Sequence, residues 1–215
     1  MKPFIQPYHY NFLAEHSLNL LKTNQWVNDQ GTRGTLRSLI IEKIHETFPD
    51  SSLTELALLE EILLIEKSHK EVQAYLEKLT PLIIPFKAPT DSELKKLFKK
   101  TKKLKLPDWQ GFPLTDFSFY GWNDPGQQRK YLIYYENDQL IGVDGVVSPT
   151  VKTSICSICH TKSPVTLFMA RVRGGHDGTY LNQGNYICYD SHQCNKQIQR
   201  RTELEAFMAN VKYQK

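Results

Sequence analysis

The sequence lacks the long apolar runs and the short catalytic motifs that mark several large classes of protein. No stretch of its 215 residues approaches the about 18 consecutive apolar residues of a transmembrane helix. The N-terminal residues hold no apolar secretory leader, so we expect a soluble, cytoplasmic protein. A P-loop, a GxGxxG and an H-x-E with a P-C-x-x-C partner are also missing, which argues against nucleotide hydrolysis, dinucleotide binding and zinc deamination.

Histidine, the commonest metal ligand among side chains, is present but not in a ligand pattern. His9, His16, His45 and His69 fall in the first 87 residues, and none of them pairs with another at a spacing of four. We therefore expect surface or hydrogen-bonded histidines there. Since no other catalytic pattern stands out, the residues indicate a binding protein that is not an enzyme.

Cysteine is scarce, and all four cysteines lie close together in sequence. Cys156 and Cys159 have the two-residue gap of a zinc knuckle, and Cys188 and Cys194 supply a second pair. Buried filler would be scattered along the chain, and disulfides need an oxidising compartment, so the clustering predicts one structural Zn²⁺. A site closed by four thiolates leaves no open position for a catalytic water.

The identity of the fourth ligand is less clear than that of the other three. Cys188 and Cys194 enclose five residues, whereas a pair of this kind commonly encloses two. His192 lies between them at a usable spacing and stays open as the alternative ligand. Cys194 is preferred because it leaves no cysteine without a role, and His160 is expected to neighbour the site without binding the metal.

Charge is unevenly divided along a chain whose overall composition is ordinary for a globular protein. Residues 1–87 carry 9 lysines and arginines against 11 acidic residues, whereas residues 88–215 carry 18 against 12. Four thiolates on one zinc ion would lower the net charge of the second part from +6 to about +4. That charge is too small to require a nucleic-acid partner.

Residues 1–87 show apolar residues at helical spacing in four stretches. The predicted helices cover residues 8–26, 36–48 with Thr35 as N-cap, 54–65 and 70–79. Because their connections are short, they should form a small antiparallel bundle. Pro85 and Pro89 then fix an extended connection, which predicts two domains, 1–87 and 88–215.

The densest positive charge follows this boundary. A helix over residues 93–103, capped by Asp91 or Ser92, would carry six lysines around one apolar stripe. Those lysines form either a solvated face or a contact with phosphate or an acidic protein surface, and lysines alone do not separate these options. Residues 103–107 then alternate like an edge strand.

The rest of the second domain is predicted to be β-rich. Strands are expected at residues 117–122, 130–135, 139–147, 165–172 and 185–188, with turns at 123–126 and 136–138 and a loop at 173–178. A helix over residues 195–212 follows the second cysteine pair, so residues 151–215 have the order of a treble clef. The predicted fold class is α+β, an N-terminal four-helix bundle followed by a mixed α/β domain with an antiparallel sheet and a treble-clef-like four-cysteine zinc site.

Several motifs occur together along the whole chain. The most specific is Tyr186-Ile187-Cys188 followed after five residues by Cys194-Asn195-Lys196-Gln197. The others are YHYNF at residues 8–12, PF at 85–86, LFKKTKKLKLP at 97–107, GWN at 121–123 and RKYLIYY at 129–135. In this order they resemble the FusB/FusC-type fusidic acid resistance proteins.

The resemblance implies a function. Members of that family have a helical bundle and a treble-clef-like zinc domain, and they bind the translocase elongation factor G. They free the factor from ribosomes on which fusidic acid has trapped it, without binding the drug. By resemblance, this chain would act as a monomer on the ribosome-bound factor, bind it through the C-terminal domain, and give resistance by target protection.

The resemblance also implies contact residues. The family's contact surface includes an aromatic residue before the first cysteine, a basic residue and a tyrosine shortly before the third, and a phenylalanine in the last helix. The tyrosine falls on Tyr186 and the phenylalanine on Phe207. Ile155 stands where the aromatic residue would be and Gln183 where the basic residue would be. Half of the contact positions therefore depart from the family pattern.

Two other functions stay open from the residues. The first is a zinc-stabilised RNA-binding protein that acts on the ribosome through the lysines of residues 95–105, which a steep salt dependence of binding would reveal. The second is a zinc enzyme, which needs one of the four ligands to be absent or displaceable.

Overall fold

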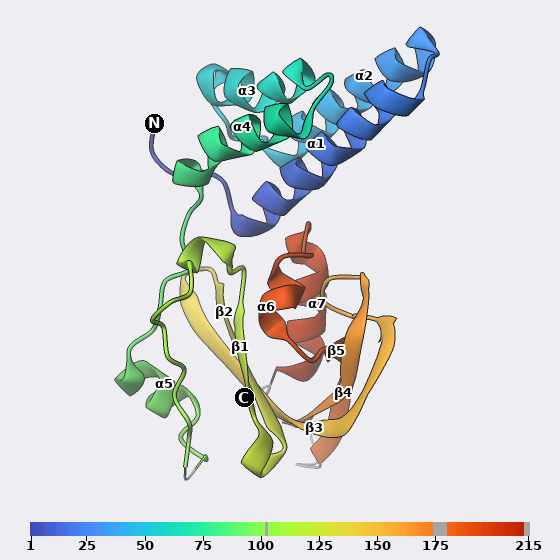
Figure 1. Cartoon of the computed structure of the whole chain (residues 1–215). Coiled ribbons are helices and arrows are strands. Elements are labelled where there is room, and N and C mark those ends of the chain that lie inside the picture. The colour runs from blue at the N-terminus through green and yellow to red at the C-terminus, as the bar shows by residue number, and fades with distance from the viewer. Residues whose placement is uncertain (102, 174–179, 213–215) are drawn as a thin grey trace. The chain divides into compact units, whose positions relative to one another are not determined.

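The computed structural model describes residues 1–101, 103–173 and 180–212. The chain divides into two compact units, Met1–Ile84 and Pro85–Lys215, each with its own hydrophobic core (Figure 1). The first unit is helical, and the second combines an antiparallel sheet with helices, which confirms the predicted α+β class. None of the helices in the described part of the chain is long and apolar enough to cross a membrane.

The first unit consists of short-linked helices with strong local start signals. Its helices are α1 Pro7–Trp26, α2 Gln30–Thr47, α3 Leu53–Glu60, η1 Glu61–Leu64, α4 His69–Leu79 and η2 Thr80–Leu82. Ser52 and Glu55 form a capping box at the start of α3, and the Ser68 side chain accepts a hydrogen bond from the N–H of Glu71 at the start of α4. These caps explain why α3 and α4 begin within a residue of their predicted starts.

The predicted N-cap of the second helix is wrong. Asp29 caps α2 by accepting a hydrogen bond from the N–H of Thr32, so the helix begins well before Thr35. Thr35 instead lies inside the helix, where its hydroxyl donates to the carbonyl of Gly31. The two glycines near the start of α2 make this part of the sequence look like a loop, because glycine is typical of turns.

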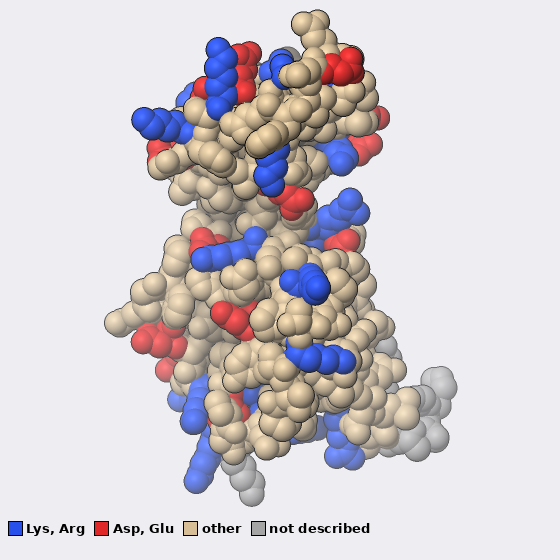
Figure 2. All heavy atoms as spheres, turned by 45° about the vertical axis from the view of Figure 1, so that its right-hand side comes forward, with Lys and Arg blue, Asp and Glu red and all other residues tan. Residues whose placement is uncertain are grey.

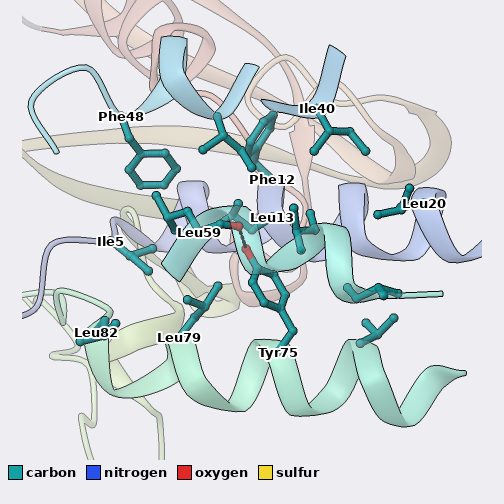
Figure 3. Close-up of a cluster of buried hydrophobic side chains, with 14 of the residues drawn as sticks. Ile5, Phe12, Leu13, Leu20, Ile40, Phe48, Leu59, Tyr75, Leu79 and Leu82 are labelled. Carbon is teal, nitrogen blue, oxygen red and sulfur yellow. Dashed lines mark hydrogen bonds between the residues drawn. The ribbon is translucent and has the colours of Figure 1, made fainter. Parts of the chain in front are cut away.

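Aliphatic side chains fill the interior of the first unit. The surface is different, since acidic and basic side chains are mixed on the face of this unit that Figure 2 shows. Figure 3 shows the interior, where Leu13 of α1, Leu59 of α3 and Leu79 of α4 converge, all with no exposed surface. The hydroxyl of Tyr75 is buried among them and donates to the carbonyl of Leu59 at 2.8 Å. A parallel bridge between Ile5 and Ile83 ties the N-terminal segment to the end of this unit.

The second unit is built on five antiparallel strands in chain order. They are β1 Tyr120–Asp124, β2 Arg129–Glu136, β3 Gln139–Ile155, β4 Lys162–Arg173 and β5 Tyr180–Cys188. Asn137 and Asp138 close the β2–β3 hairpin with φ angles of 49° and 60°, which suits a tight hairpin turn. The β3–β4 register shifts between Val147 and Val151, around Pro149, which has no N–H for the ladder. Beyond this bulge, β3 continues to the first cysteine of the knuckle.

Two helices lie against this sheet. Helix α6 Ser191–Asn195 contacts both β1 and β5, the two edge strands, while α7 Arg201–Val211 contacts β4 and β5. A short helix touches both edges only because the sheet curls around it, as Figure 1 shows. The prediction of one helix over residues 195–212 is wrong, since residues 196–200 separate α6 from α7 and bury Ile198.

The basic helix is much shorter than predicted. Helix α5 Asp91–Leu97 is capped by Thr90, not by Asp91 or Ser92, and Thr90 forms a capping box with Glu93. Phe98 leaves the helical conformation, and its ring packs edge-on against Trp122 at a centroid distance of 5.8 Å. Packing of this aromatic side chain into the sheet therefore ends the helix before most of the lysines.

Residues 103–107 do not form the predicted edge strand. The carbonyl of Lys105 accepts a hydrogen bond from the indole of Trp122, and that of Lys103 accepts one from the amide of Gln127. Side chains therefore satisfy these carbonyls in place of a strand ladder. The predicted loop at residues 173–178 lies, apart from Arg173, outside the described residues.

Candidate metal centre and the surface around it

The four cysteine side chains meet at one buried point of the second unit. Their Sγ atoms all lie within 4.8 Å of one another. The Sγ atoms of Cys156 and Cys194 are 3.8 Å apart, and those of Cys159 and Cys188 are 3.7 Å apart. A tetrahedron with Zn–S bonds of about 2.3 Å has sulfurs about 3.8 Å apart, so the cluster fits one zinc ion.

The first pair lies on a knuckle that follows β3. The N–H of His160 donates to the carbonyl of Cys156 at 2.9 Å, and the N–H of Cys156 donates to the carbonyl of Thr161 at 3.1 Å. His160 has a φ of 54°, a left-handed conformation that turns the chain back into β4. The N–H of Ile158 points at the sulfur of Cys156 at 3.3 Å, as expected for a knuckle prepared to hold a negative sulfur.

The second pair is brought in by the end of a strand and a short helix. Cys188 is the last residue of β5, and its N–H also points at the sulfur of Cys156 at 3.3 Å. Cys194 lies in α6, whose start is capped by the carboxylate of Asp190. The N–H of Ser157 in the knuckle donates to the carbonyl of Tyr186 in β5, which joins the two halves of the site.

The alternative ligand lies away from the sulfurs. The Nε2 of His192 is 3.4 Å from the Oδ2 of Asp116, and its ring packs on Phe117 at a centroid distance of 5.3 Å. Across the described part of the chain, the candidate metal cluster contains Cys194 and neither His192 nor His160. His160 is an exposed neighbour of the centre.

The electrostatics of the cluster favour a bound cation. Hydrogen bonds from the neighbouring thiols hold the pKa of Cys156 far below its ordinary value. The same sulfur contacts, together with burial, raise the pKa of Cys194 well above its ordinary value. The pKa of Cys159 is also lowered and that of Cys188 is also raised, so without a metal ion the four thiols do not all ionise readily. A divalent cation that favours sulfur would allow all four to ionise.

A set of polar contacts, not found from the sequence, joins the segment of the second cysteine pair to β1, to the two residues before β1 and to β2. The buried amide of Asn195 donates to the carbonyl of Phe119 and accepts from the N–H groups of Ser118 and Phe119. The carbonyl of Tyr189 accepts hydrogen bonds from Asn123 and from Lys130. In the sequence, Asn195 stands out only as part of a motif. Nothing in the sequence indicates that Lys130 is buried, because its burial depends on the curl of the sheet.

A groove of about 380 Å³ lies beside the metal centre. The knuckle, β5 and α7 form its walls, which include Ser157, Asn185, Thr202, Glu203 and Phe207. Phe207 is only 5% exposed, and its ring packs against Phe168 of β4. Its aromatic ring therefore forms part of the floor of the groove.

The other expected contact residues lie around β5, on both faces of the sheet. Gln183 is opposite Ala170 in the register, on the face that meets α7, whereas Tyr186 is opposite Leu167, on the other face. Tyr186 is half-buried, with the ammonium of Lys152 3.7 Å from its ring centroid. Ile155, 57% exposed, ends β3 next to the knuckle. A partner that contacts both Tyr186 and Phe207 has to reach around the edge strand β5.

Comparisons with known proteins agree with this architecture. Residues 4–87 match the family model for the N-terminal part of the elongation factor G-binding protein, and residues 95–214 match the FBP C-terminal treble-clef zinc-finger. The solved structure of the fusidic acid resistance protein FusC is 30% identical, with a TM-score of 0.84 and 97% of each chain covered. No curated protein matches at a significant level. With a treble-clef match and four clustered sulfurs, the chain has a site for one structural zinc ion, and it belongs to the FusB/FusC-type family of elongation factor G-binding proteins.

Proposed function

We propose that this chain binds elongation factor G through the unit that carries the zinc site and promotes release of the factor from ribosomes stalled by fusidic acid. Cys156, Cys159, Cys188 and Cys194 are the four zinc ligands, and domains 1–87 and 88–215 fold as separate bodies. The protein works as a cytoplasmic monomer, contacts the factor and not the drug, and catalyses no reaction.

The proposal rests mainly on the surface that this chain, as a member of the family, presents beside its metal centre. The groove near Phe207 and the exposed edge around Tyr186 surround the same strand, β5. Figure 2 shows broad uncharged areas on the visible face of Pro85–Lys215. Such a surface suits a protein partner, because protein interfaces have few charges at their centre.

Release of a stalled factor requires a difference in affinity. A protein shifts an equilibrium only by binding one state better than the other. We propose that the chain binds the releasing or released conformation of the factor more tightly than the drug-stalled one. The zinc site supports this by holding the knuckle, the end of β5 and α6 in a fixed arrangement, so little ordering is needed when the partner binds.

The binding part is tested by titration with purified elongation factor G. Tyr186→Ala is expected to weaken binding at least about tenfold, as truncation of a central aromatic contact does. Tyr180→Ala is the matched control, since Tyr180 lies at the other end of β5 and also has a cation, Arg171, over its ring. Equal losses in both variants, or none in Tyr186→Ala, would remove this surface from the proposal.

The release part needs a separate measurement. Ribosomes carrying factor, GDP and fusidic acid are sedimented with and without the chain, and the freed factor is measured in the supernatant. We expect the chain to raise the freed fraction and Tyr186→Ala to do so poorly. Binding without release would leave a factor-binding protein and contradict the rescue mechanism.

Salt dependence addresses the alternative of an RNA-binding protein. Asp91, Ser92, Lys95 and Lys96 of α5 line a shallow hollow together with Lys99, which follows this helix. Binding to ribosomes through such lysines would weaken steeply as salt rises, because counterions are released from phosphates. A weak salt response, unaffected by Lys95→Gln and Lys99→Gln, is expected if the factor is the partner.

A further inference from the structure

Lys130 is a lysine in an unusual place. It lies in β2 among large apolar and aromatic residues, and only 1% of its surface is exposed. Lysine is almost never fully buried unless its charge is compensated, because removing an ammonium from water is costly. Burial lowers the pKa of Lys130 to about 8, and the nearby cysteine sulfurs, Cys194 foremost, act in the opposite direction.

The ammonium of Lys130 reaches the segment between the second pair of cysteines. It donates to the carbonyl of Tyr189 at 2.8 Å and to the Oδ1 of Asn123 at 3.2 Å, and Asn123 donates to the same carbonyl at 3.1 Å. Tyr189 directly follows Cys188. The neutral oxygens of these two partners take up two of the three N–H donors of the ammonium but do not balance its charge.

The negative groups near Lys130 belong mainly to the metal centre. Its electrostatic partners are Cys194, Asp190, Cys188 and Cys156. Within the residues that the structure describes, Lys130 forms no ion pair with a carboxylate, and Asp190 is already engaged as the cap of α6. Four thiolates around one Zn²⁺ carry a net charge of about −2, and this charge, like that of the ammonium alone, is unfavourable in a protein interior.

We propose that Lys130 is the internal counter-cation of the zinc tetrathiolate and a positioning residue for the segment that holds its second cysteine pair. The ammonium and the metal-bound thiolates stabilise each other, because the single positive charge of Lys130 offsets part of the net negative charge of the zinc-bound thiolates. Lys130 therefore raises zinc affinity and makes the bound thiolates less nucleophilic. This inference rests on the proposed assignment of four cysteine ligands, and it is independent of the partner.

Three substitutions separate the charge of Lys130 from its hydrogen bonds. Lys130→Gln keeps a donor for the Tyr189 carbonyl but removes the charge, Lys130→Met removes both, and Lys130→Arg keeps the charge. Lys196→Met is the matched control, since Lys196 lies two residues after Cys194 but is exposed. Zinc retention is measured against a competing chelator, and thiolate reactivity is measured by alkylation of the zinc-loaded protein with iodoacetamide.

The expected result is a loss of zinc affinity of about tenfold or more in both Lys130→Gln and Lys130→Met, with faster alkylation. Lys196→Met should stay within about twofold, because water screens an exposed charge. Wild-type affinity in Lys130→Gln would show that only the hydrogen bond matters and would overturn the proposal. If neither neutral variant folds with excess zinc, Lys130→Arg decides, since a loss above about tenfold there contradicts the counter-cation role.

The ligand assignment is checked in the wild-type protein. Cobalt substituted for zinc should show the absorption of a tetrahedral four-sulfur site at one ion per chain. A spectrum with fewer sulfurs would remove the basis of the inference before any variant is made. None of these measurements involves elongation factor G, so failure to bind the factor leaves this inference standing.

Discussion

The interiors of the two units are built from different groups. The core of Met1–Ile84 is mainly aliphatic and draws on all its helices, whereas the core cluster beneath α5 in Pro85–Lys215 is mainly aromatic. With tyrosines set aside, Ser17 is the one buried polar residue among the described residues of the first unit, while the second buries Asp124, Lys130, Ser163, Thr166, Ser191 and Asn195. Four thiols lie among these polar groups.

The difference concerns how each unit achieves a unique fold. Aliphatic burial is non-directional, so the first unit depends on the total apolar area removed from water and on local helix caps. Buried polar groups are favourable only when every partner is in place. The second unit therefore depends on a few specific contacts, above all those that join the two edges of its curled sheet at the metal centre.

Removal of zinc should produce the largest difference in stability between the two units. We expect a chelator to loosen the knuckle, the end of β5 and α6, because structural zinc contributes about 10–16 kcal/mol in small zinc-finger peptides and much of the second unit is organised around it. Helices α1–α4 should keep their protection in hydrogen exchange measured by mass spectrometry. Cys156→Ser should reproduce the pattern, and equal loss of protection in both units would contradict the comparison.

A cavity in the aliphatic core should have the reverse effect. Leu13→Ala is expected to lower the free energy of unfolding of the first unit by about 2–5 kcal/mol, because Leu13 is fully buried in the core. Zinc content should not change. Leu18→Ala is the control on the same helix, since Leu18 is 37% exposed, and its effect should stay below about 1 kcal/mol. Denaturant titration followed by circular dichroism measures both.

Mild acid should weaken the first unit through His9. Its Nδ1 is buried without a partner in the described residues, and burial lowers the pKa of His9 to about 4. A lowered pKa means that the folded state prefers the neutral ring. The resulting stability is present above pH 6.5 and is lost as pH falls towards 4, by about 2 kcal/mol after allowance for partial exposure.

Hydrogen exchange of α1 between pH 7 and 5, corrected for intrinsic rates, would follow this change. The substitution His9→Phe should flatten the pH dependence, because the phenyl ring keeps the packing on Phe48 but does not titrate. An unchanged slope in that variant would assign the effect to other groups.

The smallest expected effect is a gain in the second unit. His160 has a left-handed φ of 54°, which glycine adopts without steric cost. His160→Gly should therefore stabilise the zinc-loaded unit by about 0.5–1 kcal/mol. Asn137→Gly, at a φ of 49° in the β2–β3 turn, should gain less, because asparagine tolerates this conformation. A loss of stability in His160→Gly would instead indicate that the imidazole has a role at the knuckle.

Sequence patterns predicted elements best where local signals were complete. Helices α3 and α4 start beside capping residues that are visible in the sequence, and strands β2 and β4 carry long apolar and aromatic runs. The prediction failed where packing overrode a local pattern. Phe98 ends α5 by packing into the sheet. The predicted last helix is interrupted between α6 and α7, where Ile198 is buried.

The sequence by itself determined the α+β class, the family and the four cysteines, because these depend on periodicity, motif order and spacing. Only the tertiary structure decided that Cys194 and not His192 meets the other sulfurs, that Tyr186 and Phe207 belong to opposite faces of one edge strand, and that Lys130 is buried next to the metal centre. The reason is physical. The first and the last of these facts depend on how the sheet curls to bring β1 and β5 to the same short helix, and the second depends on which face of the sheet α7 covers. Both arise from packing between segments far apart in the chain.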